Sequence, residues 1–307
     1  MGRVVVAGSV NTDIVVRVPH FPRPGETLPA GPLTYSGGGK GANQAVAAAR
    51  MGASVTMVGA VGDDAFSDAR LADLAADGID ASRVRRRTGI PGGVALIEVD
   101  DSGQNTIALV AGANGTVSGD EAASGVTAAL GRDGVLLCQF ELPPAATGSA
   151  LRTARRLGAR TLLNAAPYIS EAAELVGLAD VLVVNEIEAG QILGCSPVAV
   201  DDATNAADEL SRLGPSVVVI TLGPSGAYLR EPGAAELLPA PRVSVVDTTG
   251  AGDALVGAMA ALIAEGASTL HATRVGVLAG ALAVQRAGAQ PSLPYRRDVE
   301  ALLADTR

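Results

Sequence analysis

Short apolar runs alternate along the chain with longer segments in which apolar residues recur at helical spacing. Runs rich in Val, Ile and Leu are typical of strands buried on both faces of a parallel sheet. The predicted strands are Val4–Ala7, Val55–Gly59, Val135–Phe140, Thr161–Leu163, Val181–Val184 and Val217–Thr221. The predicted helices are Ala42–Met51, Ala65–Ala76, Asp120–Leu130, Ala145–Leu157, Glu186–Leu193, Ala203–Leu213, Ala251–Ala264, Leu270–Val284 and Arg296–Leu303. This alternation predicts a doubly wound α/β fold with a mostly parallel sheet and helices on both faces.

Two stretches interrupt the alternation. Residues 12–36 are rich in proline and lack a helical period, and residues 91–110 contain two apolar runs around Asp100–Gly103. Neither fits a strand–helix–strand unit, so we expect them to form a small β-sheet that acts as a lid. Ordinary edge hairpins are the alternative. No linker or repeat divides the chain, which predicts a single domain over residues 1–307.

Composition narrows the possible partners. The net charge is −9 and the basic residues form no extended patch, which argues against nucleic acid as a partner. No apolar run reaches the length of about 18 residues expected of a membrane span. Cys138 and Cys195 lack metal-ligand spacing, and so few cysteines favour a reduced, cytoplasmic protein.

The distribution of lysine is more informative. Of the 23 basic residues only Lys40 is a lysine, and it lies in the glycine-rich stretch Ser36–Asn43. The ammonium group of lysine is a compact point charge, whereas the guanidinium group of arginine is planar and spreads its charge over several N–H donors. We therefore interpret Lys40 as a residue whose site needs an ammonium group specifically.

Polar residues follow the predicted strands at their carboxyl ends, where open α/β sheets bind ligands. They are Asn11 and Asp13 after the first strand, Glu141 after the third, Asn185 and Glu188 after the fifth, and Gly223, Ser225 and Gly226 after the sixth. Each of these residues alone has an ordinary structural explanation. The occurrence of such residues at the same end of successive strands favours a binding site.

The glycine loop around Lys40 excludes two familiar nucleotide motifs. It is not a Walker A loop, because Lys40 is followed by Gly41 and not by Ser or Thr. It also lacks the spacing of a dinucleotide fingerprint, which argues against a nicotinamide oxidoreductase. The remaining interpretation is a glycine-rich turn at the start of a helix. The free backbone amides of such a turn suit an anionic or hydroxyl-rich ligand. Asn43 and Gln44 add amide side chains.

The stretch Asp247–Asp253 is followed directly by an apolar helix. Gly250 and Gly252 allow close approach of a ligand to the backbone, and the helix N-terminus directs free amides there. A phosphate group is the expected ligand at this helix N-terminus. Asp253 either caps this helix or accepts a proton from an attacking hydroxyl in phosphoryl transfer. The sequence leaves both roles open.

Gly38–Ala45 and Asp247–Asp253 together resemble the two signatures of the phosphofructokinase-B-type carbohydrate kinases. The start Gly8–Asp13 resembles the members that phosphorylate D-ribose. Further similar stretches extend the resemblance, in the right order, over essentially the whole chain: Pro24–Thr27, Gly112–Asn114, Asn185–Glu188, Thr221–Gly226 and Gly288–Ser292.

The resemblance implies a role for each matching position. The implied sugar ligands are Asn11, Asp13, Gly39, Lys40, Asn43, Glu141 and Asp253. The implied nucleotide site comprises Asn185, Thr221, Gly223, Ser225, Gly226 and Gly252. Glu188 is implied to organise Mg²⁺ through water, and K⁺ to lie among Asp247, Thr249, Ala283, Arg286, Gly288 and Ser292. Gly250, Ala251 and Gly252 match the anion hole and Asp253 the catalytic base, and the lid is implied to form a homodimer contact.

The implied reaction is transfer of phosphate from ATP to O5 of D-ribose. Another sugar or a nucleoside is the same-family alternative, and a binding regulator without catalysis is the alternative from another class.

Two positions depart from the family. Val277 stands where a polar residue often lies near the nucleotide, so we leave it out of the site, and Asn164–Pro167 has alanine where proline is more usual.

Overall fold

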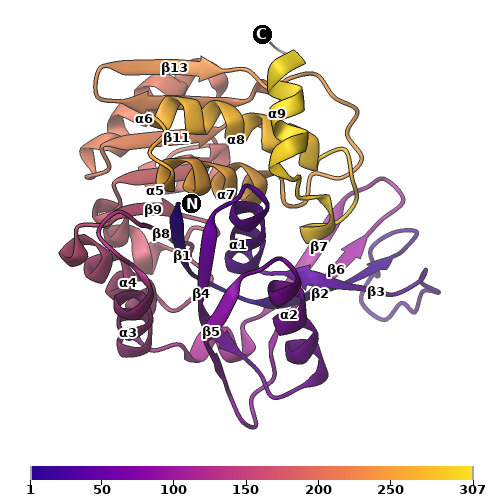
Figure 1. Cartoon of the computed structure of the whole chain (residues 1–307). Coiled ribbons are helices and arrows are strands. Elements are labelled where there is room, and N and C mark those ends of the chain that lie inside the picture. The colour runs from indigo at the N-terminus through magenta and orange to yellow at the C-terminus, as the bar shows by residue number, and fades with distance from the viewer. Residues whose placement is uncertain (1, 306–307) are drawn as a thin grey trace.

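Figure 1 shows a computed structural model of the chain, which describes residues 2–305. Residues 1, 306 and 307, at the ends of the predicted 1–307 domain, lie outside the described part. The strands are β1 (Arg3–Ala7), β2 (Asn11–Arg17), β3 (Thr34–Gly38), β4 (Ser54–Val61), β5 (Asp80–Arg86), β6 (Gly93–Val99), β7 (Asn105–Val110), β8 (Val135–Cys138), β9 (Arg160–Asn164), β10 (Val181–Asn185), β11 (Val217–Thr221), β12 (Ala227–Glu231) and β13 (Ala234–Leu238). The α-helices are α1 (Lys40–Arg50), α2 (Ala65–Ala76), α3 (Gly119–Ala129), α4 (Pro144–Leu157), α5 (Glu186–Leu193), α6 (Ala203–Arg212), α7 (Ala251–Ala264), α8 (Thr269–Ala283) and α9 (Arg296–Asp305).

Within residues 2–305, nine strands form one large sheet in the order β13-β12-β11-β10-β9-β8-β1-β4-β5. The strands from β11 to β5 in this order run parallel, and β12 and β13 join antiparallel at one edge. Helices cover both faces of this sheet (Figure 1). The predicted doubly wound α/β fold is therefore confirmed, and each predicted strand and helix occurs with ends shifted by about two residues at most.

The large sheet separates two hydrophobic layers. Val4 and Val6 of β1 belong to the layer that includes α1, α7 and α8, whereas Val5 and Ala7 belong to the layer with α3, α4 and α6. All four side chains are fully buried. Burial of one valine or leucine side chain stabilises the fold by about 1.5–3 kcal/mol. Because both faces are covered, the central strands are continuous apolar runs in the sequence.

Three strands of the large sheet were not predicted. β5 lies at one edge, and most of its residues are exposed or half-buried, with only Ala81 and Val84 packing toward the core. Its arginines therefore face solvent, and charge on an edge strand discourages pairing with further strands. β12 and β13 form the opposite edge as a short hairpin, in which β13 is also largely exposed.

A second, smaller sheet lies beside the large one, in the order β3-β2-β6-β7 (Figure 1). The pairs β2–β3 and β6–β7 are antiparallel, and β2–β6 is parallel. This sheet comes from the two segments predicted to leave the main sheet, 12–36 and 91–110, with Asn11, Gly37 and Gly38 added. The chain passes from β1 to β2 through Gly8–Val10, which places the start of the small sheet at the carboxyl end of the large one.

No helix within residues 2–305 is both long enough and apolar enough to cross a lipid bilayer.

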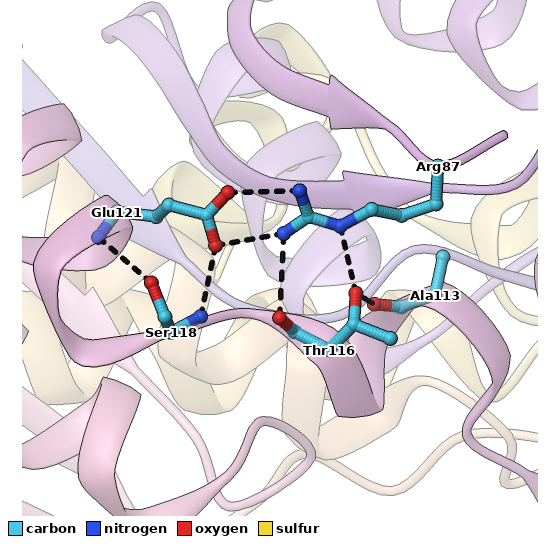
Figure 2. A network of polar contacts seen from close by, with 5 residues as sticks. All are labelled: Arg87, Ala113, Thr116, Ser118 and Glu121. Carbon is cyan, nitrogen blue, oxygen red and sulfur yellow. Dashed lines mark hydrogen bonds and ion pairs between the residues drawn. The ribbon is translucent and has the colours of Figure 1, made fainter.

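An ion pair joins the end of β5 to the start of α3 (Figure 2). The two terminal guanidinium nitrogens of Arg87 donate to the carboxylate of Glu121 at 2.8 and 2.7 Å, and Arg87 also donates to Oγ1 and the carbonyl of Thr116. Glu121 and Ser118 cap α3 reciprocally, each accepting from the backbone N–H of the other. These hydrogen bonds, that from Arg87 above all, lower the pKa of Glu121 to about 2.

Replacing Glu121 with Gln should destabilise the protein at neutral pH by about 1 kcal/mol, because the amide keeps the cap but loses the charge that faces Arg87. The folded pKa of about 2 lies below the ordinary 4.5. The charge therefore stabilises the fold fully above pH 4.5, and this stabilisation is lost as the pH falls from 4.5 towards 2. Urea unfolding of both proteins at about pH 7 and about pH 3 measures the effect.

The difference between the two proteins should shrink at the lower pH; a difference that stays constant would contradict the ion-pair contribution. Glu300→Gln is the matched control, because it removes an exposed pair with Arg296 within one helix. Such a pair contributes a few tenths of a kcal/mol, so its loss should change the unfolding free energy little (about 0.3–0.5 kcal/mol).

Candidate active site

Polar residues from successive strands meet at the carboxyl edge of the large sheet, beside a cavity of about 840 Å³. The predicted site residues that line the cavity are Lys40, Asn185, Glu188, Thr221, Gly223, Gly226, Gly250, Ala251, Gly252 and Asp253. A second group, connected to Lys40 and Asp253, comprises Asn11, Asp13, Gly39, Asn43 and Glu141. The lining does not include Ser225 or the predicted cation-loop residues Asp247, Thr249, Ala283, Arg286, Gly288 and Ser292.

The turn that opens α1 requires glycine at two successive positions. A Cβ atom on Gly38 would lie 2.0 Å from Oδ1 of Asp13, so this carboxylate packs directly against the bare backbone. Gly39 has φ of +84°, in the left-handed region that side chains disfavour. The pairing of Asn11 with Gly38 then places the start of β2 against the N-terminus of α1. Asn11 and Asp13 form one wall of a small polar pocket there.

Glu141 connects this pocket to the N-terminus of α1. Its Oε2 accepts from the backbone N–H of Lys40 at 3.0 Å and from the hydroxyl of Ser9 at 2.5 Å. A carboxylate is stabilised at a helix N-terminus, where free amides carry partial positive charge. Burial nevertheless raises the pKa of Glu141 above its usual value. Glu141 therefore fixes the first turn of α1 as well as contributing charge to the pocket.

Asp253 lies in the first turn of α7 and is only 6% exposed. Its Oδ2 accepts from Nδ2 of Asn43, and its Oδ1 accepts from Nε2 of Gln44, both at 2.9 Å. Both donors belong to α1, and no side-chain cap closes the N-terminus of α7. The carboxylate is thus held by a neighbouring helix and does not cap its own.

The N-terminus of α7 presents unpaired amides to the cavity. The N–H of Ala251 donates to the carbonyl of Thr248 at 3.3 Å, whereas the N–H groups of Gly252 and Asp253 have no acceptor within residues 2–305. A Cβ atom on Gly252 would meet nothing within 4 Å. The space in front of these amides is therefore open, and the helix dipole favours an anion there.

Lys40 is surrounded by carboxylates. Asp253 is the main cause of its raised pKa, with burial opposing and Glu141 and Glu188 adding to the effect. In the same pocket, burial is the main cause that raises the pKa of Asp13 to about 6, and repulsion from Glu141 and Asp253 adds to it. The ammonium of Lys40 thus lies between this group of carboxylates and the cavity.

Asn185 and Glu188 cap α5 reciprocally at the cavity edge. Oδ1 of Asn185 accepts from the N–H of Glu188 at 2.8 Å, and Oε2 of Glu188 accepts from the N–H of Asn185 at 2.9 Å. Burial raises the pKa of Glu188. Within the described part of the chain, no group of three or more His, Cys, Asp or Glu side chains is arranged to hold a metal ion. Glu188 lines the cavity, and it is the candidate carboxylate for a metal that is held mainly by phosphates and water.

Part of the cavity lining is apolar. Thr221 ends β11, and Gly223 and Gly226 form the turn before β12. The apolar walls come from Leu255, Val243, Val245, Val277 and Val284. Val277, which sequence analysis left out of the site, lines the cavity as part of this wall. The stretch 240–245 was also missed, because nothing in its short apolar pattern distinguishes it from an ordinary loop.

The predicted cation loop lies behind the N-terminus of α7. Oδ1 of Asp247 accepts from the N–H and hydroxyl of Thr249, and Oδ2 accepts from the N–H of Gly288 at 2.8 Å. Burial opposes ionisation of Asp247, but these hydrogen bonds lower its pKa. Ala289 lies against Gly250, since a Cβ atom on Gly250 would be 3.2 Å from its Cα. The loop therefore supports the open turn of α7 without lining the cavity.

Three buried amides near Asp253 are absent from the predicted set of site residues, although sequence analysis noted Gln44 as an amide beside the glycine turn. Gln44 donates to both Asp253 and Asn164, and Gln139 donates to Gln44. Gln44 is adjacent to a predicted sugar ligand, which was the one available signal. Gln139 and Asn164 follow or end buried strands, so their positions at the carboxyl edge could have marked them.

A buried carboxylate next to open helix amides, at the carboxyl edge of a doubly wound sheet, defines a site suited to phosphoryl transfer onto a small molecule. The chain matches the family model described as pfkB family carbohydrate kinase over residues 1–296. It belongs to this family. The resemblance drawn from the two signatures and the predicted class of enzyme, a carbohydrate kinase, are confirmed.

Individual relatives are similar to this chain over nearly its full length. A ribokinase from Schizosaccharomyces pombe is 38% identical over 311 residues, which cover 98% of this chain and 97% of the relative. The structure of Arabidopsis thaliana ribokinase complexed with ribose and ATP is 31% identical, with a TM-score of 0.88 and 98% of each chain covered. Phosphofructokinase-2 from Escherichia coli in complex with potassium is 25% identical, with a TM-score of 0.83 and 100% of each chain covered.

Proposed function

We propose that this protein transfers the terminal phosphoryl group of ATP to O5 of D-ribose, giving ribose 5-phosphate and ADP. The observation that carries the proposal is the position of Asp253, held by two amides of α1 and adjacent to the open N-terminus of α7. Asp253 lines the large cavity and lies near the polar residues Asn43, Asp13 and Glu141. The similarity to ribokinases, one of them complexed with ribose and ATP, supports ribose as the sugar.

The polar pocket suits a neutral sugar rich in hydroxyls. Asn11, Asp13, Gly39, Lys40, Asn43 and Glu141 hold the sugar in this proposal. Oδ1 of Asn43 is buried and has no hydrogen-bond partner within residues 2–305. A buried acceptor of this kind is costly unless a ligand donates to it. A sugar hydroxyl supplies that donor, and the carboxylates of Asp13 and Glu141 accept from others.

Phosphoryl transfer depends mainly on positioning and on stabilisation of charge. Asp253 accepts the proton of the attacking hydroxyl in this proposal. The open amides near Gly252, in the turn Gly250–Gly252, face the transferring phosphate, and Lys40 places a positive charge between sugar and phosphate. On the nucleotide side, Asn185, Thr221, Gly223, Ser225 and Gly226 hold the phosphates and ribose of ATP, and the apolar wall with Val277 contacts the base.

The residues around Glu188 fit a hydrated Mg²⁺ ion. Mg²⁺ keeps most of its waters and is commonly bound through one or two carboxylates together with substrate phosphates. Glu188 lines the cavity with one carboxylate oxygen committed to the α5 cap. Its other oxygen orders the waters of the ion in this proposal, and the amide of Asn185 assists.

A K⁺ ion in the cation loop is proposed to increase activity. Its ligands are oxygens of Asp247, Thr249, Ala283, Arg286, Gly288 and Ser292. The contact of Ala289 with Gly250 supports a coupling between this loop and the anion-binding turn. The structure of a family member in complex with potassium supports the choice of ion. Rates in sodium and in potassium at equal ionic strength test the proposal, and equal rates would contradict it.

The small sheet is proposed to close over the sugar and to form a homodimer contact. Tyr35, Ile14 and Leu96 lie in one row across β3, β2 and β6. Tyr35 and Leu96 are about half exposed on this face. Ile107 and Leu109 of β7 are exposed on the opposite face, because Leu96 pairs with the residue between them. Exposed apolar side chains on a sheet favour an interface. Sedimentation of the intact chain tests the dimer.

A cytoplasmic location is the final part of the proposal. Cys138 and Cys195 are both free thiols, as expected in a reducing compartment. Both proposed substrates, ATP and a small sugar, carry no requirement for a membrane surface. Fractionation of the native host, with detection of the chain in the cytoplasmic fraction, tests it.

Asp253→Asn should reduce kcat by about 10²–10⁴-fold while sugar and ATP still bind, because the amide cannot accept the hydroxyl proton. Folding should survive, since Asn43 can turn its unpartnered Oδ1 towards the new NH₂ group. Coupled ADP release over a panel of pentoses, hexoses and nucleosides, with melting temperatures in the presence of each ligand, measures both effects.

Asp298→Asn is the matched control, because Asp298 also lies in the first turn of a helix but outside the cavity. The control should keep its full rate. A folded Asp253→Asn protein with more than about a tenth of the wild-type kcat would falsify the base assignment. Preference of the wild-type protein for another sugar would overturn the choice of ribose alone.

Glu188→Gln should raise the Mg²⁺ concentration needed for half-maximal rate by about tenfold, with little change in the sugar KM. The amide oxygen still accepts from the N–H of Asn185, so the cap of α5 is kept and only the charge is lost. Glu121→Gln is the control, because Glu121 caps α3 in the same way far from the cavity. An unchanged Mg²⁺ titration would contradict the role of Glu188.

A further inference from the structure

A chain of buried amide side chains lies directly behind Asp253. Nε2 of Gln139 donates to Oε1 of Gln44 at 2.5 Å, and Nε2 of Gln44 donates to both Oδ1 of Asp253 and Oδ1 of Asn164, each at 2.9 Å. Gln44 and Gln139 are fully buried, and neither lines the cavity. Because neither side chain has exposed surface, neither is available for direct contact with a ligand in this structure.

The direction of this chain is fixed at its two ends. Nδ2 of Asn164 donates to the carbonyl of Val183 at 3.1 Å, so its Oδ1 faces Gln44 and requires a donor. At the other end Gln139 presents N–H to Oε1 of Gln44. Gln44 therefore directs its NH₂ group at Asp253, and the opposite orientation would place an amide oxygen against a carboxylate.

Packing alone does not require an amide at position 139. Oε1 of Gln139 is buried and has no hydrogen-bond partner within residues 2–305. A buried polar atom without a partner destabilises a fold, and an apolar side chain of similar size would avoid this cost. The contribution of Gln139 is instead the single hydrogen bond that orients Gln44.

We propose that Gln44 and Gln139 are positioning residues for phosphoryl transfer, acting through the carboxylate of Asp253. Gln44 holds Oδ1 while Asn43 holds Oδ2, so the carboxylate cannot rotate. Gln139 prevents Gln44 from reversing its amide. The inference rests on the proposed role of Asp253 as the base. Small displacements of a reacting group lower rates strongly, by up to about 10²-fold for an ångström.

Gln139→Met tests the inference, because it removes the donor and keeps the approximate volume. We expect kcat to fall about tenfold with the sugar and ATP KM within about twofold of wild type, since binding groups are untouched. Gln44→Met should lower kcat further, by about 10²-fold. Gln139→Asn keeps an amide but shortens its reach, so it should show the same type of loss if the Met variant folds poorly.

A double-mutant cycle separates positioning from general loosening of the fold. Added to Asp253→Asn, Gln139→Met should change the residual rate by less than about twofold, because the carboxylate on which it acts is gone. Thr153→Val is the control: it removes a buried hydroxyl that accepts from Arg156 on α4, and its kcat should match wild type.

Wild-type kcat in Gln139→Met, or an equal loss in both backgrounds, would overturn the positioning role. These outcomes are distinct from failure of the proposed function, which would appear as retained activity in Asp253→Asn alone. A loss in Thr153→Val equal to that in Gln139→Met would also contradict the inference, because any buried hydrogen bond would then have the same effect.

Discussion

The close crossing of α1 and α7 is the constraint on which the site depends. A Cβ atom on Gly257 would lie 2.4 Å from Cβ of Ala47 and 2.7 Å from the carbonyl oxygen of Gln44. The two helices are rich in alanine and approach at this point almost backbone to backbone. Asn43 and Gln44 of α1 consequently reach Asp253 of α7, so the carboxylate is fixed by packing between helices that are far apart in sequence.

Much of the fold was predictable from local pattern. The central strands are apolar runs, because both faces of the sheet are covered and consecutive residues of each strand are therefore buried. These strands are β1, β4, β8, β9, β10 and β11. The edge strands were missed for the opposite reason. β5 has only two half-buried side chains, Ala81 and Val84, which are three positions apart, so the strand shows no alternating pattern. Tertiary position at the edge, rather than local propensity, makes this segment a strand.

The site was predictable where the backbone itself is constrained. The glycine turns before α1 and α7 are visible in sequence because only glycine permits their conformation or close approach. Gln44 and Gln139 are different, because each has only a weak local signal: Gln44 is adjacent to a predicted sugar ligand, and Gln139 follows a buried strand. Their pairing joins positions 95 residues apart, and it becomes visible only when the fold brings the residue after β8 next to Gln44 of α1. Asn185 and Glu188 show a third case, in which one spacing serves both a helix cap and a cavity wall.

The distribution of charged groups in the site explains why Lys40 lies at its centre. Asp13, Glu188 and Asp253 are buried around it and Glu141 is half-buried. Burial, with repulsion from Glu141 and Asp253 added, raises the pKa of Asp13 to about 6. Carboxylates suit a neutral sugar, whose hydroxyls donate to them, but they repel the phosphates of a nucleotide. The amides at the N-terminus of α7 and the ammonium of Lys40 supply the opposite sign without adding a further acidic group. An arginine there would carry the same charge on a planar fork, which matches two oxygens on one acceptor better than several acceptors around a point. In the proposed mechanism, the compact ammonium faces the carboxylates on the sugar side and the transferred phosphate at once, so a single charge links binding of the two substrates.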